Sequence, residues 1–170
     1  FILKLSQGKN MTIKPGDCIP TATLYVIGND GPISTKTSDL FKGKKVAMFG
    51  LPGAFTPTCS AKHVPSYLNN AAALREKGID TIICLSVNDA FVMGAWGKEH
   101  NVGDNIIMAG DGNALFSKEL GLDVDLTDHG MGVRCQRFSM IVEDGVVSVL
   151  NHEPPGEYRI SSAETMLEQL

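Results

Sequence analysis

The strongest constraint on the fold is the alternation of short apolar runs with segments of helical spacing. Residues 46–49, 81–87 and 106–109 are apolar runs of the length and composition of buried strands. Between the first two, residues 57–77 place apolar side chains at helical spacing, and Gly78 fits the residue that ends such a helix. Pro65 interrupts this helix and should kink it, since proline lacks a backbone donor. Strands that alternate with helices predict an α/β fold, in which helices cover the faces of a sheet.

The rest of the chain supplies antiparallel strands and further helices. The residue patterns predict a strand at 23–27, followed by a turn at 29–32 and a helical turn near 38–41. A helix from Asn88 or Asp89 to His100 and a short helix at 114–120 come next. The chain then forms a hairpin of 138–142 and 146–150 and a final helix with a capping box from Ser161 to Glu164. The hairpin makes the predicted sheet mixed. The element order matches a thioredoxin-like fold with insertions, as one domain over residues 11–170.

Composition excludes several functional classes. The chain has 170 residues, of which 43% are hydrophobic, enough for one domain with a substantial core. The net charge of -4 and the lack of a dense basic run argue against nucleic-acid binding. No apolar run approaches the roughly 18 residues of a membrane span, so we expect no membrane insertion.

The cysteines argue against a metal or a disulfide framework. Cys18, Cys59, Cys84 and Cys135 lie far apart, without CxxC or zinc-type spacing. We therefore expect free thiols in a reducing compartment and no metal. Residues 110–112 fit a turn better than a phosphate-binding loop, so no organic cofactor is expected either.

The first ten residues are expected to lie outside the domain. Residues 1–10 contain two lysines and no acid, and they precede Met11. This pattern favours a remnant of cloning before a natural start at Met11. On that interpretation we expect a cytoplasmic location. The alternative is a fragment of a leader, which would place the protein in mitochondria.

Cys59 is the candidate for chemistry. Pro57 suits the first turn of a helix and Thr56 its N-cap, so Cys59 falls where unpaired N–H groups and the helix dipole favour a thiolate. A reactive cysteine also needs a cationic partner, for which Arg134 and Arg137 are the candidates. The residues alone leave open the alternative that Cys59 is a small buried apolar side chain.

The residues around Cys59 resemble those of a known family. Pro52, Thr56 and Cys59 fill the spacing Pro-x-x-x-Thr-x-x-Cys of the peroxiredoxins, and residues 51–60 are similar to the peroxiredoxin-5 subfamily, called type II in plants. The resemblance continues in the same order at residues 62–65, 86–89, 91–93 and 137–140.

The resemblance implies a thiol-dependent peroxidase for hydrogen peroxide and alkyl hydroperoxides. Cys59 matches the peroxidatic cysteine, which attacks the peroxide bond and becomes a sulfenic acid. Arg137 matches the arginine that stabilises the thiolate and polarises the peroxide, and Thr56 the threonine that positions both. Pro52 matches the proline that shields the cysteine from water.

Two further residues are expected to contact the peroxide. Thr58 would do so through its backbone N–H, and Gly53 lies in the same loop. Peroxide cleavage moves negative charge from sulfur to the departing oxygen, so fixed donors along that path stabilise the transition state.

The resemblance also bears on the reductant. Two-cysteine members of the subfamily carry a resolving cysteine near the C-terminus, but residues 156–162 contain none. Cys84 matches a second cysteine of some members, yet its strand predicts a buried packing role. We therefore expect a one-cysteine cycle regenerated by glutathione and glutaredoxin, with thioredoxin as the other candidate reductant.

Other interpretations remain at this point. A non-catalytic binding or chaperone module could use the same fold. For His63, four residues after Cys59, a packing or solvent role is favoured over that of general base. Members of the subfamily form dimers through the active-site edge, so a homodimer is expected.

Overall fold

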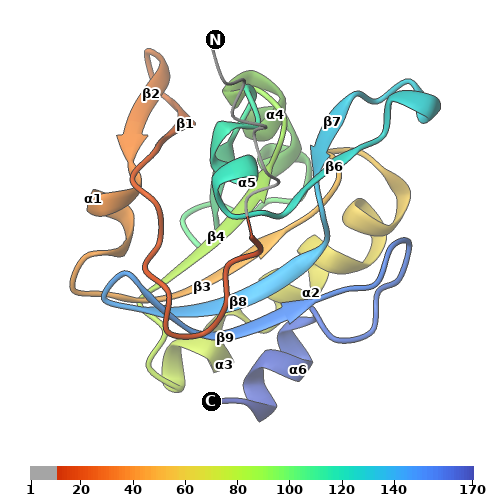
Figure 1. Ribbon diagram of the computed structural model, residues 1–170. Coiled ribbons are helices and arrows are strands. Elements are labelled where there is room, and N and C mark those ends of the chain that lie inside the picture. Colours follow the sequence, from red (N-terminus) through yellow and green to blue (C-terminus); the bar gives the residue numbers. More distant parts are fainter. Residues whose placement is uncertain (1–10) are drawn as a thin grey trace, which may run out of the picture.

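The computed structural model describes residues 11–170, and the interpretation of residues 1–10 falls outside that range (Figure 1). A seven-stranded sheet, in the order β2-β1-β5-β4-β3-β8-β9, forms its centre. The strands are β1 Thr23–Gly28, β2 Gly31–Lys36, β3 Lys45–Gly50, β4 Thr81–Ser86, β5 Ile107–Gly110, β8 Phe138–Glu143 and β9 Val146–His152. A separate two-stranded sheet consists of β6 Asp123–Asp125 and β7 Val133–Cys135.

Six α-helices and two short helical turns connect these strands within the described part of the chain. They are α1 Thr37–Phe41, α2 Val64–Asn69, α3 Ala71–Glu76, α4 Ala90–Glu99, α5 Leu115–Glu119 and α6 Ala163–Glu168, with a π-helical turn at Cys59–His63 and a 3-10 turn at Thr127–His129. The predicted thioredoxin-like fold is confirmed, since β3, β4 and β5 are parallel and the β8–β9 hairpin pairs antiparallel to β3.

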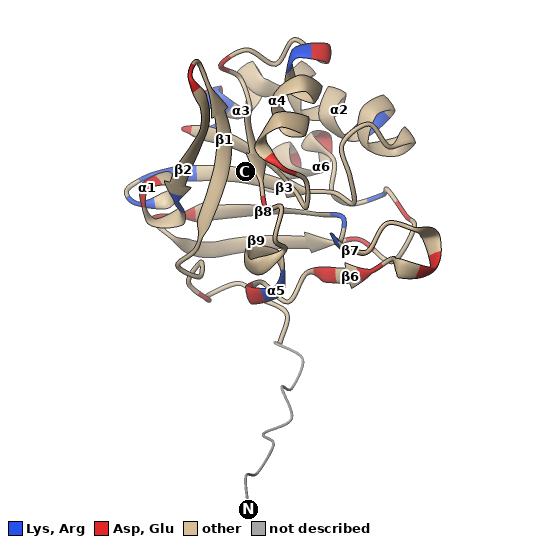
Figure 2. Ribbon diagram, turned by 90° about the horizontal axis from the view of Figure 1, so that it is seen from above, with Lys and Arg blue, Asp and Glu red and all other residues tan. Residues whose placement is uncertain are grey.

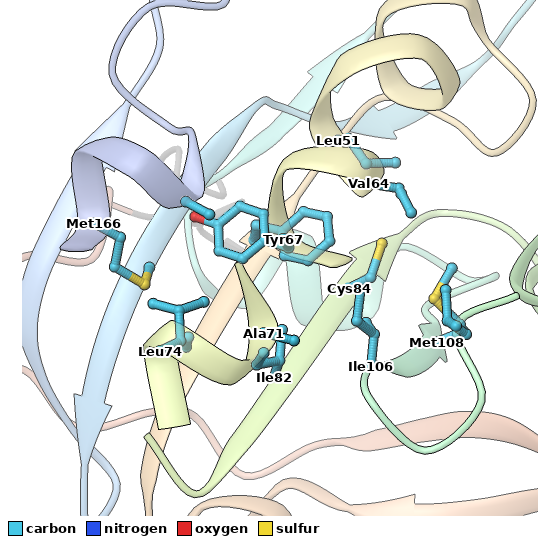
Figure 3. Close-up of a cluster of buried hydrophobic side chains, with 14 of the residues drawn as sticks. Leu51, Val64, Tyr67, Ala71, Leu74, Ile82, Cys84, Ile106, Met108 and Met166 are labelled. Carbon is cyan, nitrogen blue, oxygen red and sulfur yellow. The ribbon is translucent and has the colours of Figure 1, made fainter. Parts of the chain in front are cut away.

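The central strands are apolar on both faces because helices cover both. Along β3, Ala47 and Phe49 face one core cluster, and Val46 and Met48 face the other. The first cluster gathers apolar side chains of α2, α3, α4 and α6, and Figure 3 shows part of it around Tyr67. The second cluster takes its helical side chains from α1 and α5. The sheet is therefore the rigid platform on which the loops after β3 and before β8 are placed.

The helix predicted at residues 57–77 is wrong as a single element. The structure divides it into the π-helical turn Cys59–His63, α2 and α3, with a break at Asn70. Pro65 lies in the first turn of α2, where its missing N–H costs little, and the wider π turn precedes it. Gly78 does end the segment with a positive φ of 98°.

The predicted capping box is also wrong by one residue. Ser162 caps α6, and its hydroxyl accepts a hydrogen bond from the Thr165 N–H at 3.2 Å. Glu164 does not turn back to the cap, because its carboxylate accepts hydrogen bonds from Ser66 and Asn70 instead. By contrast, the predicted cap at Asp89 is confirmed, since its side chain accepts from the Val92 N–H.

One close contact between strands sets a testable limit on the sequence. Gly50 pairs with Phe138 across β3 and β8, and a Cβ at Gly50 would lie 2.1 Å from the Phe138 ring. We expect Gly50→Ala to destabilise the protein by about 1–3 kcal/mol through overpacking, as measured by urea unfolding. Gly112→Ala is the matched control, because a Cβ there would meet nothing closer than 3.6 Å. Equal midpoints for the two variants would contradict the prediction.

Candidate active site

Cys59 lies at the start of the helical segment that follows β3, with its side chain fully buried. Arg137 immediately precedes β8, the strand paired with β3, and the register of that pairing brings it beside the cysteine. The Arg137 Nη2 donates a hydrogen bond to Cys59 Sγ at 3.2 Å. A guanidinium this close is a charged hydrogen-bond donor aimed at the sulfur.

Thr56 shapes the turn before the cysteine. Its carbonyl accepts the Ser60 N–H at 2.9 Å, so its backbone does begin the helical segment. Its hydroxyl donates to the Gly53 carbonyl at 2.7 Å, so the predicted side-chain cap is wrong. The hydroxyl hydrogen is thus engaged within the loop, and the oxygen keeps lone pairs for another donor.

The loop of residues 52–55 is fastened from two sides. Asn88, just after β4, accepts the Ala54 N–H at 3.0 Å through its side-chain oxygen. Arg134 donates to the Pro52 carbonyl at 3.4 Å and would lie 3.0 Å from a Cβ at Gly53. Of the two candidate arginines, Arg137 therefore contacts the thiol, and Arg134 supports the loop.

His63 belongs to the site: it is fully buried, which agrees with the favoured packing role, and it also contacts Arg137, which that role did not include. Its Nδ1 lies 2.9 Å from Arg137 Nη1, and its Nε2 lies 3.0 Å from the carbonyl oxygen of Ser161. Burial, and next the charge of Arg137, lower the pKa of His63 to about 3, so the ring is neutral. Its position four residues after Cys59 was the one signal in the sequence for this contact.

A pocket of about 570 Å³ opens above this group of residues. Pro52, Thr58, Lys62, Arg137 and Tyr158 line it, together with residues of β6, the following turn and the loop after β9. The Arg137 guanidinium also lies 5.8 Å from the centre of the Tyr158 ring. The predicted residues Pro52, Thr58 and Arg137 thus face one cavity that a small ligand can enter.

Cys59 itself lies behind Arg137 and does not line this pocket, and neither do the other three cysteines. Cys84 and Cys135 are buried free thiols, and Cys18 is exposed. Burial, and next the nearby Cys59, raise the pKa of Cys84 well above its ordinary value, and burial raises that of Cys135 to about 12. In Figure 3 the Cys84 sulfur points from β4 toward Val64, within the apolar cluster. Both thiols are therefore protonated at neutral pH.

Features of other protein classes are not found among residues 11–170. No group of three His, Cys, Asp or Glu side chains there could hold a metal ion. No helix in that part of the chain is long and apolar enough to cross a membrane. Figure 2 shows Lys and Arg interspersed with Asp and Glu along the ribbon.

Fold and site together define a thioredoxin-like protein built around a buried cysteine under an arginine. Comparisons give the family: the Redoxin family model matches residues 14–167. Peroxiredoxin-2E of Arabidopsis thaliana, a chloroplastic protein, is 49% identical over an alignment that covers 94% of this chain and 70% of that relative. Peroxiredoxin-2B of the same plant is 45% identical over an alignment that covers 93% of this chain and 98% of that relative. The chain belongs to the peroxiredoxin family.

Solved structures agree with this assignment. Reduced Prx3 from Vibrio vulnificus, in complex with hydrogen peroxide, superposes with a TM-score of 0.89 at 46% identity, over 93% of this chain and 99% of that one. The protein is therefore an enzyme, a thiol-dependent peroxidase, and the alternative of a non-catalytic module is set aside. The plant relatives carry the name peroxiredoxin-2, so their names do not show the expected peroxiredoxin-5 subfamily.

Proposed function

We propose that Cys59 is the peroxidatic cysteine, and that the enzyme reduces hydrogen peroxide and alkyl hydroperoxides through a sulfenic acid on this residue. The observation that carries the proposal is the hydrogen bond from Arg137 to the buried Sγ at 3.2 Å. A buried thiolate is costly unless donors compensate for its lost hydration. At this site the guanidinium and the start of a helical segment supply that compensation.

In the proposed step the thiolate attacks the terminal oxygen of the hydroperoxide. A sulfur–oxygen bond forms, the oxygen–oxygen bond breaks, and the remaining oxygen leaves as an alkoxide or hydroxide that takes up a proton. Arg137 stays charged throughout and can follow the negative charge from sulfur to the leaving oxygen. The Thr56 hydroxyl oxygen would accept a hydrogen bond from the peroxide, since its own hydrogen is donated to Gly53, and Thr58 and Gly53 would bound the peroxide site.

The remaining half of the cycle is proposed to use an external thiol. One glutathione would attack the sulfenic acid, releasing water and forming a mixed disulfide, and a second thiol, on glutaredoxin or glutathione, would free Cys59. The absence of a cysteine from residues 156–162 supports this cycle. The protonated, buried state of Cys84 supports it too, because a thiol in that state is a poor partner for a disulfide.

We further propose membership of the type II, or peroxiredoxin-5, subfamily, and a homodimer. Peroxiredoxin 5 from Alvinella pompejana superposes with a TM-score of 0.82 at 32% identity, over 92% of this chain and 96% of that one. Phe55, in the active-site loop, and Phe91, on α4, are 51% and 64% exposed. Large exposed apolar side chains beside a site favour a contact with a second copy.

The first prediction from the proposed function concerns Cys59. Because the proposed nucleophile is the thiolate, Cys59→Ser should reduce the rate of peroxide consumption by about 10³-fold or more while the protein stays folded. The single tryptophan offers a direct signal, since Trp96 Nε1 donates to the hydroxyl of Ser60, next to the cysteine. Stopped-flow fluorescence should show a peroxide-dependent change that Cys59→Ser lacks and the control Cys84→Ser keeps. Parental activity in Cys59→Ser would refute the proposal.

The second prediction concerns the reductant. After one equivalent of peroxide, mass spectrometry should find sulfenic acid at Cys59, and then a single glutathione adduct on the same residue. Turnover should require glutathione with glutaredoxin, and the Cys84→Ser variant should turn over as fast as the parent. A stoichiometric internal disulfide, with turnover supported by thioredoxin alone, would contradict the one-cysteine cycle.

The third prediction concerns assembly. Phe91→Glu places a charge on the proposed contact and should shift a dimer to monomers in sedimentation velocity runs at micromolar concentration. Ile33→Glu is the matched control, because Ile33 is also exposed, at 55%, but lies on the edge strand β2. A monomeric parent protein would contradict the proposed dimer.

A further inference from the structure

The segment after β9, which contains no resolving cysteine, is hydrogen-bonded to residues that contact the active site. Glu153, 3% exposed, accepts hydrogen bonds at one carboxylate oxygen from the N–H groups of Arg159, Ile160 and Ser161, at 2.7, 2.9 and 3.0 Å. The same oxygen accepts from the Ser161 hydroxyl at 2.8 Å. Burial raises the pKa of Glu153, but these bonds outweigh it and the pKa lies below its ordinary value.

Glu153 is also tied to the catalytic arginine through the backbone. Its N–H donates to the Arg137 carbonyl at 3.0 Å, which extends the pairing between β8 and β9 by one step. The carbonyl of Ser161, at the end of the clamped turn, lies 3.0 Å from both His63 Nε2 and the Tyr67 hydroxyl. The turn therefore presents a fixed acceptor to the histidine.

The partners of His63 define a single tautomer. Arginine has no acceptor, so Arg137 must donate and Nδ1 of His63 must accept. A carbonyl has no donor, so Nε2 must carry the hydrogen and donate to Ser161. The rings of Phe49 and Tyr158, centred 4.8 and 5.2 Å from the imidazole, restrict its rotation.

We propose that His63 is a positioning residue, held in its Nε2–H tautomer by the turn that Glu153 clamps, and that it aims the Arg137 guanidinium at Cys59. The inference rests on the proposed role of Cys59. A neutral acceptor has a specific advantage over a carboxylate here. It fixes one nitrogen of the guanidinium without cancelling its charge, so the positive potential acts on the sulfur and the peroxide.

His63 takes no proton in this arrangement. The ionisable groups around it are Cys59 and Tyr67 from its own helical segments, Arg137 before β8, and Tyr158 after β9. The cation lies in direct contact, which opposes a second charge on the ring. Because the pKa of His63 is about 3, its protonated form is absent above that pH, and no titration of this residue is expected between pH 5 and pH 8.

Two substitutions separate the two hydrogen bonds of His63. In His63→Asn the side-chain oxygen replaces Nδ1 and keeps an acceptor for Arg137, whereas His63→Gln keeps a donor near Ser161 and removes that acceptor. We expect His63→Gln to slow both peroxide reduction and alkylation of Cys59 by iodoacetamide at pH 7 by about tenfold. His63→Asn should recover most of that loss. His100→Gln, at the residue that follows α4, is the control and should match the parent.

Other outcomes would overturn the inference. If Asn and Gln slow the reaction equally, in step with equal losses of thermal stability, His63 has a packing role only. A rate profile of the parent with an inflection near pH 6.5 that disappears in His63→Asn would make it a general base instead. A parental rate in Cys59→Ser would refute the proposed function itself, whereas a requirement for Cys59 with a normal His63→Gln would refute only the positioning role.

A measurement on the parent protein keeps the test independent of how the variants fold. Nitrogen-15 NMR of the imidazole between pH 5 and pH 8 should show a neutral ring protonated at Nε2, with no change across the range. A ring protonated at Nδ1, or at both nitrogens, would overturn the inference.

Discussion

The pairing of β3 with β8 is the interaction on which the site depends. These strands lie about 90 residues apart in the chain, yet their register sets Gly50 opposite Phe138 and so brings Arg137 to the cysteine that follows β3. The absence of a side chain at Gly50 lets the Phe138 ring approach the strand, which keeps that register tight. Buried apolar surface on both faces of β3 stabilises the pairing, so the core and the chemistry share one structural cause.

Burial of the cysteine sets the second requirement, because a thiolate removed from water must be compensated within the protein. The guanidinium of Arg137 provides the charge, and its other side is satisfied by a neutral ring. If that ring were charged, two cations would compete for one space, and if it were a carboxylate the arginine would be neutralised. The low pKa of His63 and the contact of Arg137 with the sulfur are therefore two results of one arrangement.

Local patterns predicted most helices, the position of Cys59 and every strand of the large sheet except β2, because strands and caps depend on neighbours in the sequence; the short strands β6 and β7 were also missed. The resemblance to the peroxiredoxins, which includes residues 137–140, then indicated Arg137, which spacing alone could not distinguish from Arg134. The π turn at Cys59–His63 was missed because Pro65 can fit a helix either as a kink or as a first-turn residue. The contact of His63 with Ser161 joins residues 98 positions apart, so only the folded chain reveals it.

The same network bears on how the proposed external thiol would reach the sulfur. A peroxide is small enough for the pocket beside Arg137, but Cys59 is fully buried, and a tripeptide thiol would have to approach in line with the new sulfur–oxygen bond. The π turn that carries Cys59 departs from regular α-helical geometry, and the side chain of its N-cap residue, Thr58, makes no capping hydrogen bond. In the proposed cycle, oxidation would remove the negative charge on the sulfur that Arg137 contacts, and this turn would lose an interaction that favours the buried position. Oxidation itself would then lower the free energy of opening and admit the reductant.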